Sequence, residues 1–327
     1  MHSPNHLLEL FQRYREDNRF LQPPNELYAP IDYILDIGGK RIRPLLVLMA
    51  CNLFKEEVEP ALPAAYAVEI FHNFTLLHDD IMDNAPLRRG QPSVHVRYNT
   101  NTGILSGDVM LIYAYDYLLR VKESREGAST ELLRLFNKSA IEVCEGQQLD
   151  MNFECRSDVQ IPEYLRMIEL KTAALLSGAL CMGGSIGGAS RADVDRLDLF
   201  GRKLGIAFQL QDDILDTFGD PEKFGKKVGG DIVQNKKTYL LLKAMEKADA
   251  PSLARLHELM EDGQLSDGEK VAAVTEIYNR FGVREEAQEL QQLYTDEAYA
   301  ALEAIEVASE RKSGLKQMTS MLLGREY

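Results

Sequence analysis

Two clusters of aspartates are the residues of this sequence best suited to chemistry. Asp79, Asp80 and Asp83 end an apolar stretch of helical periodicity, and a helix of 3.6 residues per turn places Asp79 and Asp83 one turn apart on the same side. Carboxylates at this end of a helix repel one another and the helix dipole, so a cation should offset them. By itself, such a cluster is more often a solvated helix end.

A second cluster shifts the balance toward a metal site. Gln209, Asp212, Asp213 and Asp216 follow the spacing i, i+3, i+4 and i+7, which is a single polar stripe on an otherwise apolar helix. Two such stripes on helices that face each other across a bundle would form an all-oxygen site. Mg²⁺ suits such a site, because this hard ion binds carboxylates, water and phosphate oxygens.

Basic residues flank both clusters, which indicates an anionic substrate. Mg²⁺ held by carboxylates usually takes substrate phosphates as further ligands, and Arg and Lys both bind phosphate. The basic residues are Lys40, Arg41 and Arg43 after a double glycine, Arg88 and Arg89 after the first cluster, and Lys226, Lys227, Lys236 and Lys237 after the second. Each pair alone fits a solvated loop, but together they favour a diphosphate held at both ends.

The composition argues against several classes of protein. With 37 Lys and Arg against 51 Asp and Glu, the net charge of −14 argues against a binder of nucleic acid or of anionic membranes, which needs a basic face. The 45% hydrophobic content excludes a disordered chain. The sequence contains no phosphate-binding loop, dinucleotide fingerprint or serine nucleophile elbow.

The same features predict a soluble cytoplasmic protein. No run approaches the roughly 20 consecutive apolar residues that a membrane helix needs, and the N-terminus lacks the apolar stretch of a signal peptide. The four cysteines are scattered without CxxC spacing, which is typical of free thiols in a reducing compartment. We therefore expect no membrane segment.

Helical periodicity runs from end to end and predicts an all-α fold. Without a linker or a repeat, a single domain over residues 1–327 is the economical interpretation. The glycines at 183–188 fall in a helical region, where close helix packing is the expected reason for them. Helices are expected at 5–20, 31–37, 45–54, 65–83, 104–121, 131–153, 162–187, 191–217 and 235–247, with charged outer helices at 252–312 and loops at 84–103 and 218–234.

Five stretches in order resemble a known family, the trans-isoprenyl diphosphate synthases, over nearly the whole chain. They are GGKRIRPLL at 38–46, LLHDDIMDNAPLRRG at 76–90, GQQLD at 146–150, KTAALLS at 171–177 and FQLQDDILDTFGD at 208–220. The resemblance implies a helical bundle around a deep central cavity, the isoprenoid synthase fold, usually as a homodimer. It also implies condensation of an allylic diphosphate (dimethylallyl, geranyl or farnesyl) with isopentenyl diphosphate, using Mg²⁺.

The resemblance gives each marked residue a role by its motif position. The aspartates Asp79, Asp80, Asp83, Asp212, Asp213 and Asp216 would hold three Mg²⁺ on the allylic diphosphate. Arg88 would bind that diphosphate, while Arg89, Lys40, Arg43 and His72 would form the isopentenyl diphosphate pocket. Lys171, Thr172 and Gln209 would lie beside the leaving group and the forming cation. Lys226 and Lys236 match the two family lysines around Asp231, and Lys227 is the weaker match. Leu240 departs from the proline of many bacterial members.

The mechanism that fits both the residues and the resemblance is ionisation, condensation and elimination. Metals and cationic side chains would neutralise the leaving diphosphate, and the double bond of isopentenyl diphosphate would attack the allylic cation in a dry cavity. In this family, bulky residues before the first aspartate cluster close the chain tunnel. Phe71, Phe74 and Thr75 hold these positions and predict a C15 to C20 product.

Three alternatives stay open at this point. A longer-chain polyprenyl diphosphate synthase is the first, although Phe74 argues against long products. A class I terpene cyclase shares the bundle and the metal logic, but it would not need the basic run at 40–43. A regulatory subunit of a synthase typically lacks one aspartate cluster, whereas both are complete here.

Overall fold

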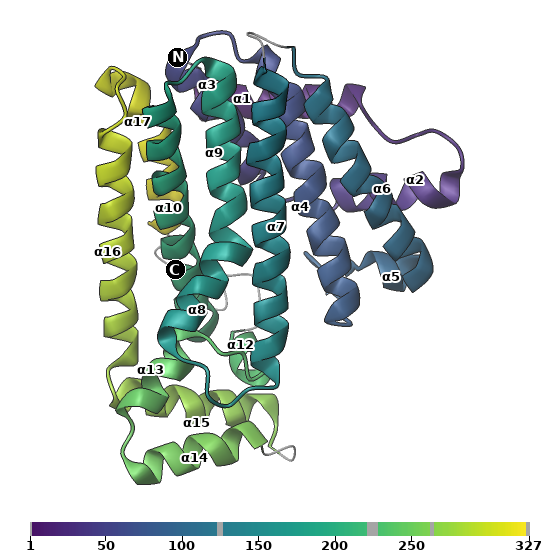
Figure 1. The fold of residues 1–327 in the computed structure, drawn as a ribbon. Coiled ribbons are helices and arrows are strands. Elements are labelled where there is room, and N and C mark those ends of the chain that lie inside the picture. Colours follow the sequence, from purple (N-terminus) through teal and green to yellow (C-terminus); the bar gives the residue numbers. More distant parts are fainter. Residues whose placement is uncertain (1, 123–126, 221–227, 262–264, 325–327) are drawn as a thin grey trace. The chain divides into compact units, whose positions relative to one another are not determined.

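A computed structural model describes residues 2–122, 127–220, 228–261 and 265–324 (Figure 1). Within them, every regular element is helical except for one short hairpin, so the all-α prediction is confirmed. The elements are α1 (Pro4–Asp17), α2 (Asn25–Asp36), α3 (Ile42–Phe54), η1 (Glu59–Ala61), α4 (Leu62–Met82), β1 (Leu87–Arg88), β2 (Gln91–Pro92), α5 (Val94–Arg97), α6 (Thr100–Leu119), α7 (Ala128–Glu154), α8 (Ile161–Ile168), η2 (Glu169–Ala173), α9 (Ala174–Gly187), α10 (Arg191–Phe218), α12 (Gly230–Val233), α13 (Tyr239–Lys247), α14 (Ala250–Glu261), α15 (Asp267–Arg280), α16 (Val283–Glu303) and α17 (Ser309–Leu323).

The chain forms two compact units, each made of several segments. The first unit comprises Met1–Lys138, Gly178–Asp198 and Ile305–Leu315, and the second comprises Ser139–Ser177, Leu199–Ala304 and Lys316–Tyr327. The long helices α7, α9 and α10 each contribute residues to both units. The single domain expected over residues 1–327 stays a prediction.

The first unit is built on α3 and α4, which are apolar around most of their circumference. In α3, every residue from Pro44 to Leu53 is buried, as expected for a central helix. Glycines of α9 let it approach α3 closely: a Cβ at Gly183 would lie 2.1 Å from the Val47 carbonyl oxygen, and one at Gly187 would lie 2.7 Å from that of Cys51. The expected packing role of these glycines is confirmed.

The second unit has its own core, to which α8, α10, α13, α14, α15 and α16 contribute. Its fully buried members include Tyr164, Leu210, Leu240, Leu256 and Val283. Burying one large apolar side chain stabilises a fold by about 1.5–3 kcal/mol. This core therefore supports the carboxyl half of α10, which carries the second aspartate cluster.

Several helix boundaries differ from the sequence predictions. The helix expected to open at Pro30 begins at Asn25, because Pro30 lies inside α2 on the face that it buries with Ile31, Ile34 and Leu35. Likewise α3 begins at Ile42, three residues before the expected start. The helix expected at 235–247 begins only at Tyr239, as α13, where the Thr238 hydroxyl caps it by accepting from the Leu241 N–H, and the expected loop at 218–234 contains α12. The expected loop at 84–103 contains the hairpin, α5 and the first turn of α6.

One helical run, Ile161–Gly187, is long and apolar enough by composition to cross a membrane. However, 72% of its apolar window is buried inside the protein, which is typical of a core helix. All four cysteines are free thiols, of which Cys51 and Cys181 are buried, while Cys144 and Cys155 are exposed.

Candidate active site

The first aspartate cluster occupies the last turn of α4, in the first unit. Asp79 is half-buried, Asp80 is 1% exposed and Asp83 is exposed at the helix C-cap. Both carboxylate oxygens of Asp80 accept hydrogen bonds from Arg88, at 3.0 and 3.2 Å from its Nε. Arg88 therefore neutralises the buried member of the cluster and leaves Asp79 and Asp83 on the more accessible side.

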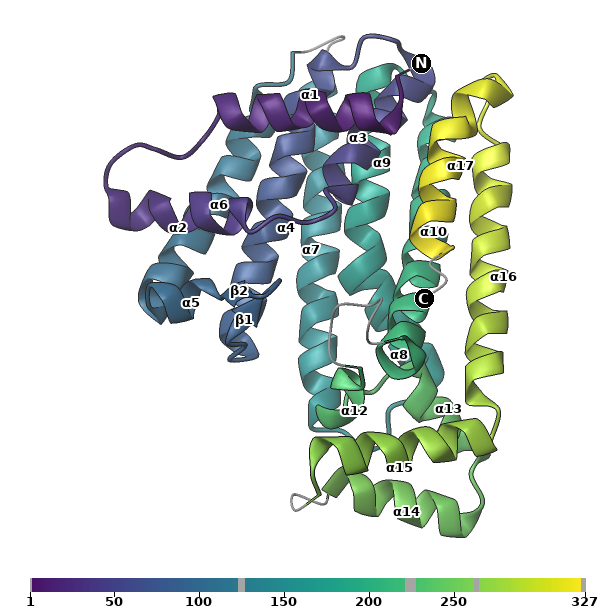
Figure 2. The ribbon, with the colours of Figure 1, turned by 180° about the vertical axis from the view of Figure 1, so that it is seen from behind.

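The β1–β2 hairpin next to the end of α4 positions Arg88 and Arg89 (Figure 2). Its turn consists of Arg89 and Gly90, both with positive φ (52° and 76°). The Arg89 guanidinium donates to the Gly38 carbonyl and lies against Gly39, where a Cβ would be 2.7 Å from Arg89 Cζ. Gly39 itself has a φ of 128°. The double glycine is therefore required both for its backbone conformation and for this close approach.

Arg43 and His72 join this group from α3 and α4. Arg43 Nη1 donates to His72 Nε2 at 3.2 Å. Burial and the positive charges of Arg43 and Arg89 hold the pKa of His72 well below its usual value, so the imidazole is neutral. Burial also lowers the pKa of Arg43 to about 10, which leaves it protonated at neutral pH. Arg43 Nε is buried without a hydrogen-bond partner among the described residues, as expected of a group that awaits an anion. The exposed Lys40 lies in the same basic run.

Arg41, from the same run, has a structural role instead. It is 8% exposed and forms a buried ion pair with Glu69 of α4, while its other nitrogen donates to the Leu35 carbonyl. Asn73 Nδ2 completes the network by donating to Glu69 Oε1 at 2.9 Å. Sequence reasoning treated Arg41 as one basic residue among several. The signal that it missed was Glu69, an acid on an apolar helix that needs a partner.

The second cluster lies on α10, in the second unit, and a chain of hydrogen bonds orders it. Thr172 Oγ1 donates to Gln209 Oε1 at 2.9 Å, and Gln209 Nε2 donates to Asp213 Oδ1 at 2.9 Å. The Tyr164 hydroxyl donates to the other oxygen of Asp213. The structure therefore brings Thr172 and Gln209 together, and it engages both oxygens of Asp213. Burial and the charge of Asp231 raise the pKa of Asp213 well above its usual value.

Asp216 and Asp231 are the next carboxylates along this site. Asp216 Oδ2 accepts from the Asp231 backbone N–H at 2.9 Å. Burial, together with the charges of Asp216 and Asp212, raises the pKa of Asp231 to about 7. Sequence reasoning used Asp231 only as a spacing marker for the lysines around it. The structure places it beside Asp216 as a half-buried acid.

The donor set of the second unit fits a divalent cation. Asp212, Asp216 and Asp231 are mutually repelling oxygen donors, and a cation among them would relieve the repulsion that raises the pKa of Asp231. In the described ranges, however, no three His, Cys, Asp or Glu side chains already form a metal cluster. The carboxylates would therefore have to adjust when an ion binds.

Lys171 and Thr172 lie in η2, a single π-helical turn. Lys171 Nζ donates to Asp150 Oδ2 at 2.6 Å, and Lys236 Nζ lies 3.7 Å from the same oxygen. A Cβ at Gly146 would lie 2.3 Å from the Lys171 backbone nitrogen, and one at Gly205 would lie 2.3 Å from the Ala173 Cβ. The glycines of α7 and α10 thus admit the widened turn between them, as is common for π-turns at functional sites.

Aromatic rings follow α4 away from the first cluster, within the first unit. Phe74 lies between His78 and Phe71, with ring centroids 4.8 and 5.6 Å away. Phe71 is fully buried and meets Phe136 of α7 at 5.2 Å, edge to face. Thr75 is half-buried, and its hydroxyl donates to the His72 carbonyl at 2.8 Å. The aromatic cluster fits the predicted floor as well as ordinary core packing.

With this geometry established, comparison with known proteins decides the family. The family model described as polyprenyl synthetase matches residues 24–279. The chain belongs to the polyprenyl synthetase family. A short chain isoprenyl diphosphate synthase from Methanothermobacter thermautotrophicus is 36% identical over 98% of this chain and 99% of its own.

Solved structures agree with this assignment. A geranylgeranyl pyrophosphate synthase has a TM-score of 0.94 at 42% identity and covers 100% of both chains. Another, from Corynebacterium glutamicum in complex with isoprenyl diphosphate and magnesium, has a TM-score of 0.86 at 27% identity and covers 99% of this chain and 98% of its own. The isoprenoid synthase fold is therefore confirmed, and this polyprenyl synthetase is a prenyltransferase by family.

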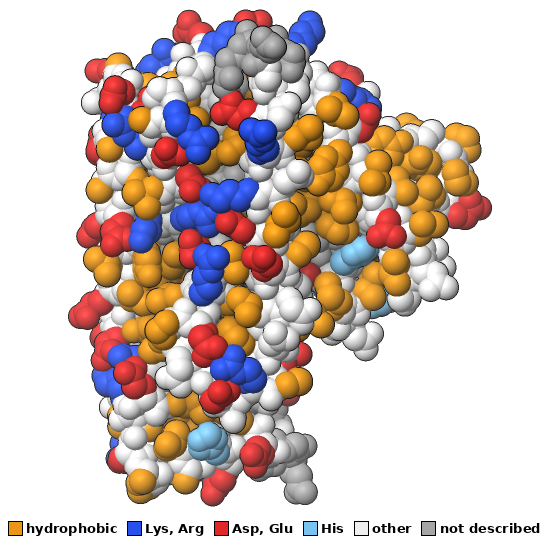
Figure 3. All heavy atoms as spheres, viewed as in Figure 1, with side chains coloured by type: hydrophobic (Ala, Val, Ile, Leu, Met, Phe, Trp, Pro, Cys, Tyr) orange, Lys and Arg blue, Asp and Glu red, His pale blue; other side chains and the backbone are white. Residues whose placement is uncertain are grey.

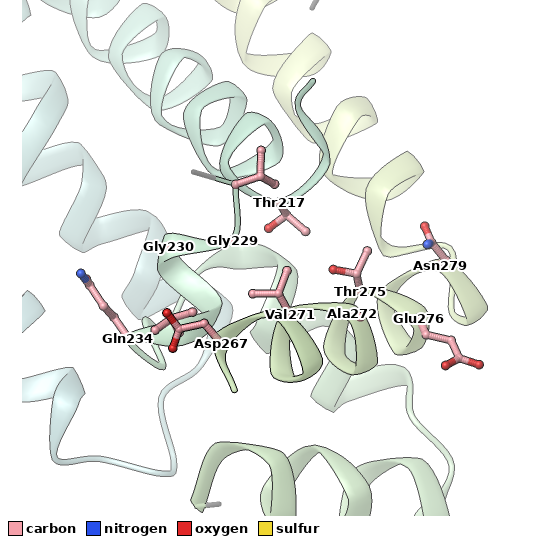
Figure 4. A pocket seen from close by; sticks show the side chains of 13 residues that line it. Thr217, Gly229, Gly230, Gln234, Asp267, Val271, Ala272, Thr275, Glu276 and Asn279 are labelled. Atoms are coloured by element: carbon pink, nitrogen blue, oxygen red, sulfur yellow. The ribbon is translucent and has the colours of Figure 1, made fainter. Parts of the chain in front are cut away.

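Two predicted residues of this polyprenyl synthetase, Lys226 and Lys227, lie outside the described residues. The first described residue after them, Val228, lines a cavity of about 630 Å³ between α12, α15 and the end of α10 (Figure 4). The cavity wall includes Thr217, Gly229 and Gly230, but none of the site residues predicted from the sequence. This cavity is therefore not the site that the sequence predicts.

Proposed function

We propose that this polyprenyl synthetase condenses dimethylallyl, geranyl or farnesyl diphosphate with isopentenyl diphosphate to give a C15 to C20 all-trans product. The observation that carries the proposal is the group Arg43, His72 and Arg89. It is a cationic cluster in which, among the described residues, the buried Arg43 Nε has no hydrogen-bond partner, and it is distinct from the Asp80–Arg88 pair. A second diphosphate needs such a pocket, whereas an enzyme with one diphosphate substrate does not.

The proposed Mg²⁺ ligands are Asp79 and Asp83 in the first unit and Asp212 and Asp216 in the second, with three ions in all. Bound Mg²⁺ would neutralise charge on the leaving diphosphate. Asp80 and Asp213 would help to position these ligands and would not bind Mg²⁺ directly, because their oxygens already accept protein hydrogen bonds. Asp80 holds Arg88 for the allylic diphosphate, and Asp213 orients Gln209.

The protein's own groups supply the rest of the chemistry. Lys171 and Lys236 are held on Asp150, ready to exchange this carboxylate for phosphate oxygens. The Thr172 hydroxyl and the Gln209 amide are fixed dipoles, which can stabilise the allylic cation without forming a covalent bond to it. Isopentenyl diphosphate held by Arg43, His72 and Arg89 presents its double bond, and the final proton leaves with the diphosphate product.

Product length tests the aromatic floor and the reaction together. The purified chain is incubated with Mg²⁺, isopentenyl diphosphate and each of the three allylic primers, and the products are measured by mass spectrometry. We expect C15 to C20 products from the wild type and longer ones from Phe74→Ala. No elongated product from any primer would refute the proposed reaction, and unchanged length in Phe74→Ala would refute the floor.

An apolar stripe on α6 supports the proposed homodimer. Ile104, Leu105, Ile112 and Leu119 follow helical spacing and are 43%, 56%, 66% and 62% exposed. Apolar side chains gather over this helix in Figure 3. Exposed stripes of this kind mark protein interfaces, and a twofold dimer can pair one stripe with its copy. Sedimentation velocity should show a dimer for the wild type and a monomer for Ile112→Lys, with Lys122→Met as a control.

The proposed localisation rests on the cysteines. The four free thiols fit a reducing compartment, so we propose that the enzyme works in the cytoplasm. Fractionation of cells that express the tagged chain tests this directly, and recovery in the membrane pellet would contradict it.

A further inference from the structure

The segment from Gly229 to Thr238 places Asp231 against Asp216 of the second aspartate cluster and Lys236 beside the acidic side chains of α7. Asp231 donates its backbone N–H to Asp216 Oδ2 at 2.9 Å, and Lys236 Nζ lies 3.3 Å from Glu154 Oε1. The segment contains only one helical turn, α12. One turn does not hold its shape in water, because helix formation needs several turns to offset the cost of nucleation. An external support must therefore fix this segment.

Helix α15 supports the segment at both ends. At the first end, Gly229 has a φ of 88° and approaches Val271 so closely that a Cβ would lie 2.5 Å from its Cγ2 (Figure 4). At the other end, Lys270 Nζ donates to Asn235 Oδ1 at 2.8 Å and lies 3.4 Å from the Val233 carbonyl oxygen. The backbone hydrogen bond from Lys236 N–H to the Asp231 carbonyl closes the turn between the two ends.

Lys270 is an unusual residue to find at this position. It is only 8% exposed, and a buried ammonium is costly unless oxygen atoms satisfy it. Within the described part of the chain it forms no ion pair, and the two oxygens that accept from it both belong to the segment. Asn235 has a φ of 55°, a conformation that asparagine and glycine tolerate better than other residues. Both hydrogen bonds of the buried Lys270 ammonium therefore go to this one turn.

We propose that Lys270 is a positioning residue for the Mg²⁺–diphosphate site, acting through Asn235 and Val233 on the segment that presents Asp231 and Lys236. This inference rests on the proposed function. Lys270 contributes no ligand, and its bonds set where the Asp231 N–H meets Asp216 and where the Lys236 ammonium lies. Loss of its bonds would let the turn shift, so that diphosphate binding weakens while the fold remains.

Four single variants of the full chain and the double variant Lys270→Met/Asn235→Gly test the proposal. Lys270→Met removes the ammonium. Asn235→Gly removes its side-chain acceptor, together with the Asn235 Nδ2 bond to the Met260 carbonyl, while still tolerating the positive φ. Asn235→Asp keeps an acceptor for Lys270. Lys312→Met is the matched control, because Lys312 is also buried (4% exposed) but belongs to the first unit. Calorimetric titration with inorganic diphosphate in the presence of Mg²⁺ measures binding, steady-state kinetics measure KM for each substrate, and thermal unfolding monitors the fold.

We expect Lys270→Met and Asn235→Gly each to weaken Mg²⁺–diphosphate binding about tenfold, with KM for isopentenyl diphosphate unchanged. The double variant should be weaker by less than the sum of the two single losses, since both single variants break the bond between Lys270 and Asn235. Asn235→Asp and Lys312→Met should bind as the wild type does. If Lys270→Met does not fold, Asn235→Gly decides the question.

The two proposals fail in different ways. Wild-type affinity in a folded Asn235→Gly or Lys270→Met, or an equal loss in Lys312→Met, would overturn the positioning role alone. A wild type that binds no Mg²⁺–diphosphate and makes no elongated product would overturn the proposed function.

Discussion

His72 Nε2 accepts a hydrogen bond from Arg43 Nη1 across 3.2 Å, so the bond exists only while the imidazole is neutral. The pair joins α3 to α4 inside the proposed isopentenyl diphosphate pocket. His72 thereby orients Arg43, which is the group proposed to bind the anion.

Arg43→Gln should raise KM for isopentenyl diphosphate at least tenfold and leave KM for the allylic substrate within about twofold. Removing a charged hydrogen-bond donor costs about 1.5–3 kcal/mol. Initial rates with each substrate varied in turn measure both constants. Arg13→Gln, at an exposed position of α1, is the control. Equal increases in both KM values would contradict a dedicated second pocket.

The lowered pKa of His72 predicts an acid-linked loss of stability. Below about pH 6.5 the unfolded chain binds a proton at this histidine and the folded chain does not, so protonation favours unfolding. The contribution of neutral His72 to the free energy of unfolding is therefore complete above the unfolded pKa. Below that pKa, the free energy of unfolding falls by up to about 1.4 kcal/mol per pH unit. Urea unfolding at pH 7.5 and 5.5 should therefore show a smaller drop for His72→Gln than for the wild type. An equal drop would mean that His72 titrates normally.

Asp212→Ala should lower kcat by two or more orders of magnitude with the fold intact, and Asp79→Ala should do the same. Each removes a charged oxygen donor that no other described group replaces, and electrostatic stabilisation usually contributes more than any other effect to such catalysis. Removing Mg²⁺ with a chelator should abolish turnover, and added Mg²⁺ should restore it. Asp195→Asn, at an exposed position, serves as the control. Near wild-type rates in Asp212→Ala would refute the metal assignment.

Gly205→Ala should disturb the π-helical turn. The new methyl group would start 2.3 Å from the Ala173 Cβ, and overpacking of this kind costs about 1–3 kcal/mol. Because Thr172 precedes Ala173, we expect kcat to fall by more than the loss of folded protein explains. Gly268→Ala is the matched control, since a Cβ there meets nothing within 4 Å. If the two variants behave alike in thermal unfolding and in kcat, the turn does not depend on this contact.

The sequence predicted which helices carry the aspartate clusters better than it predicted which side chains pair with them. Periodicity alone located α4 and α10, because both bury apolar faces around a polar stripe. Spacing placed Asp79, Asp80 and Asp83 together. It could not show that Arg88 binds Asp80, since that contact depends on the short β1–β2 hairpin.

Other features depend on contacts between segments that are distant in sequence. The burial of Arg41 with Glu69, and the link from Lys270 to Asn235, both connect residues 28 or more positions apart. No local pattern encodes such pairs. The boundaries of α2 and α3 were wrong for a related reason, because burial of Pro30 and the left-handed conformation of Arg41 (φ 51°) override local stop and start signals.

Asp150 holds both Lys171 and Lys236 before any substrate arrives, and this has a consequence for the end of the catalytic cycle. If Lys171 and Lys236 bind the diphosphate as proposed, the carboxylate competes with the diphosphate for the same two ammonium groups. When the prenyl chain has been transferred, Asp150 can reclaim the lysines and help to expel the inorganic by-product. Asp150→Asn should therefore bind inorganic diphosphate more tightly and show stronger product inhibition, which progress curves with added diphosphate would measure. Unchanged inhibition would show that turnover does not use this exchange.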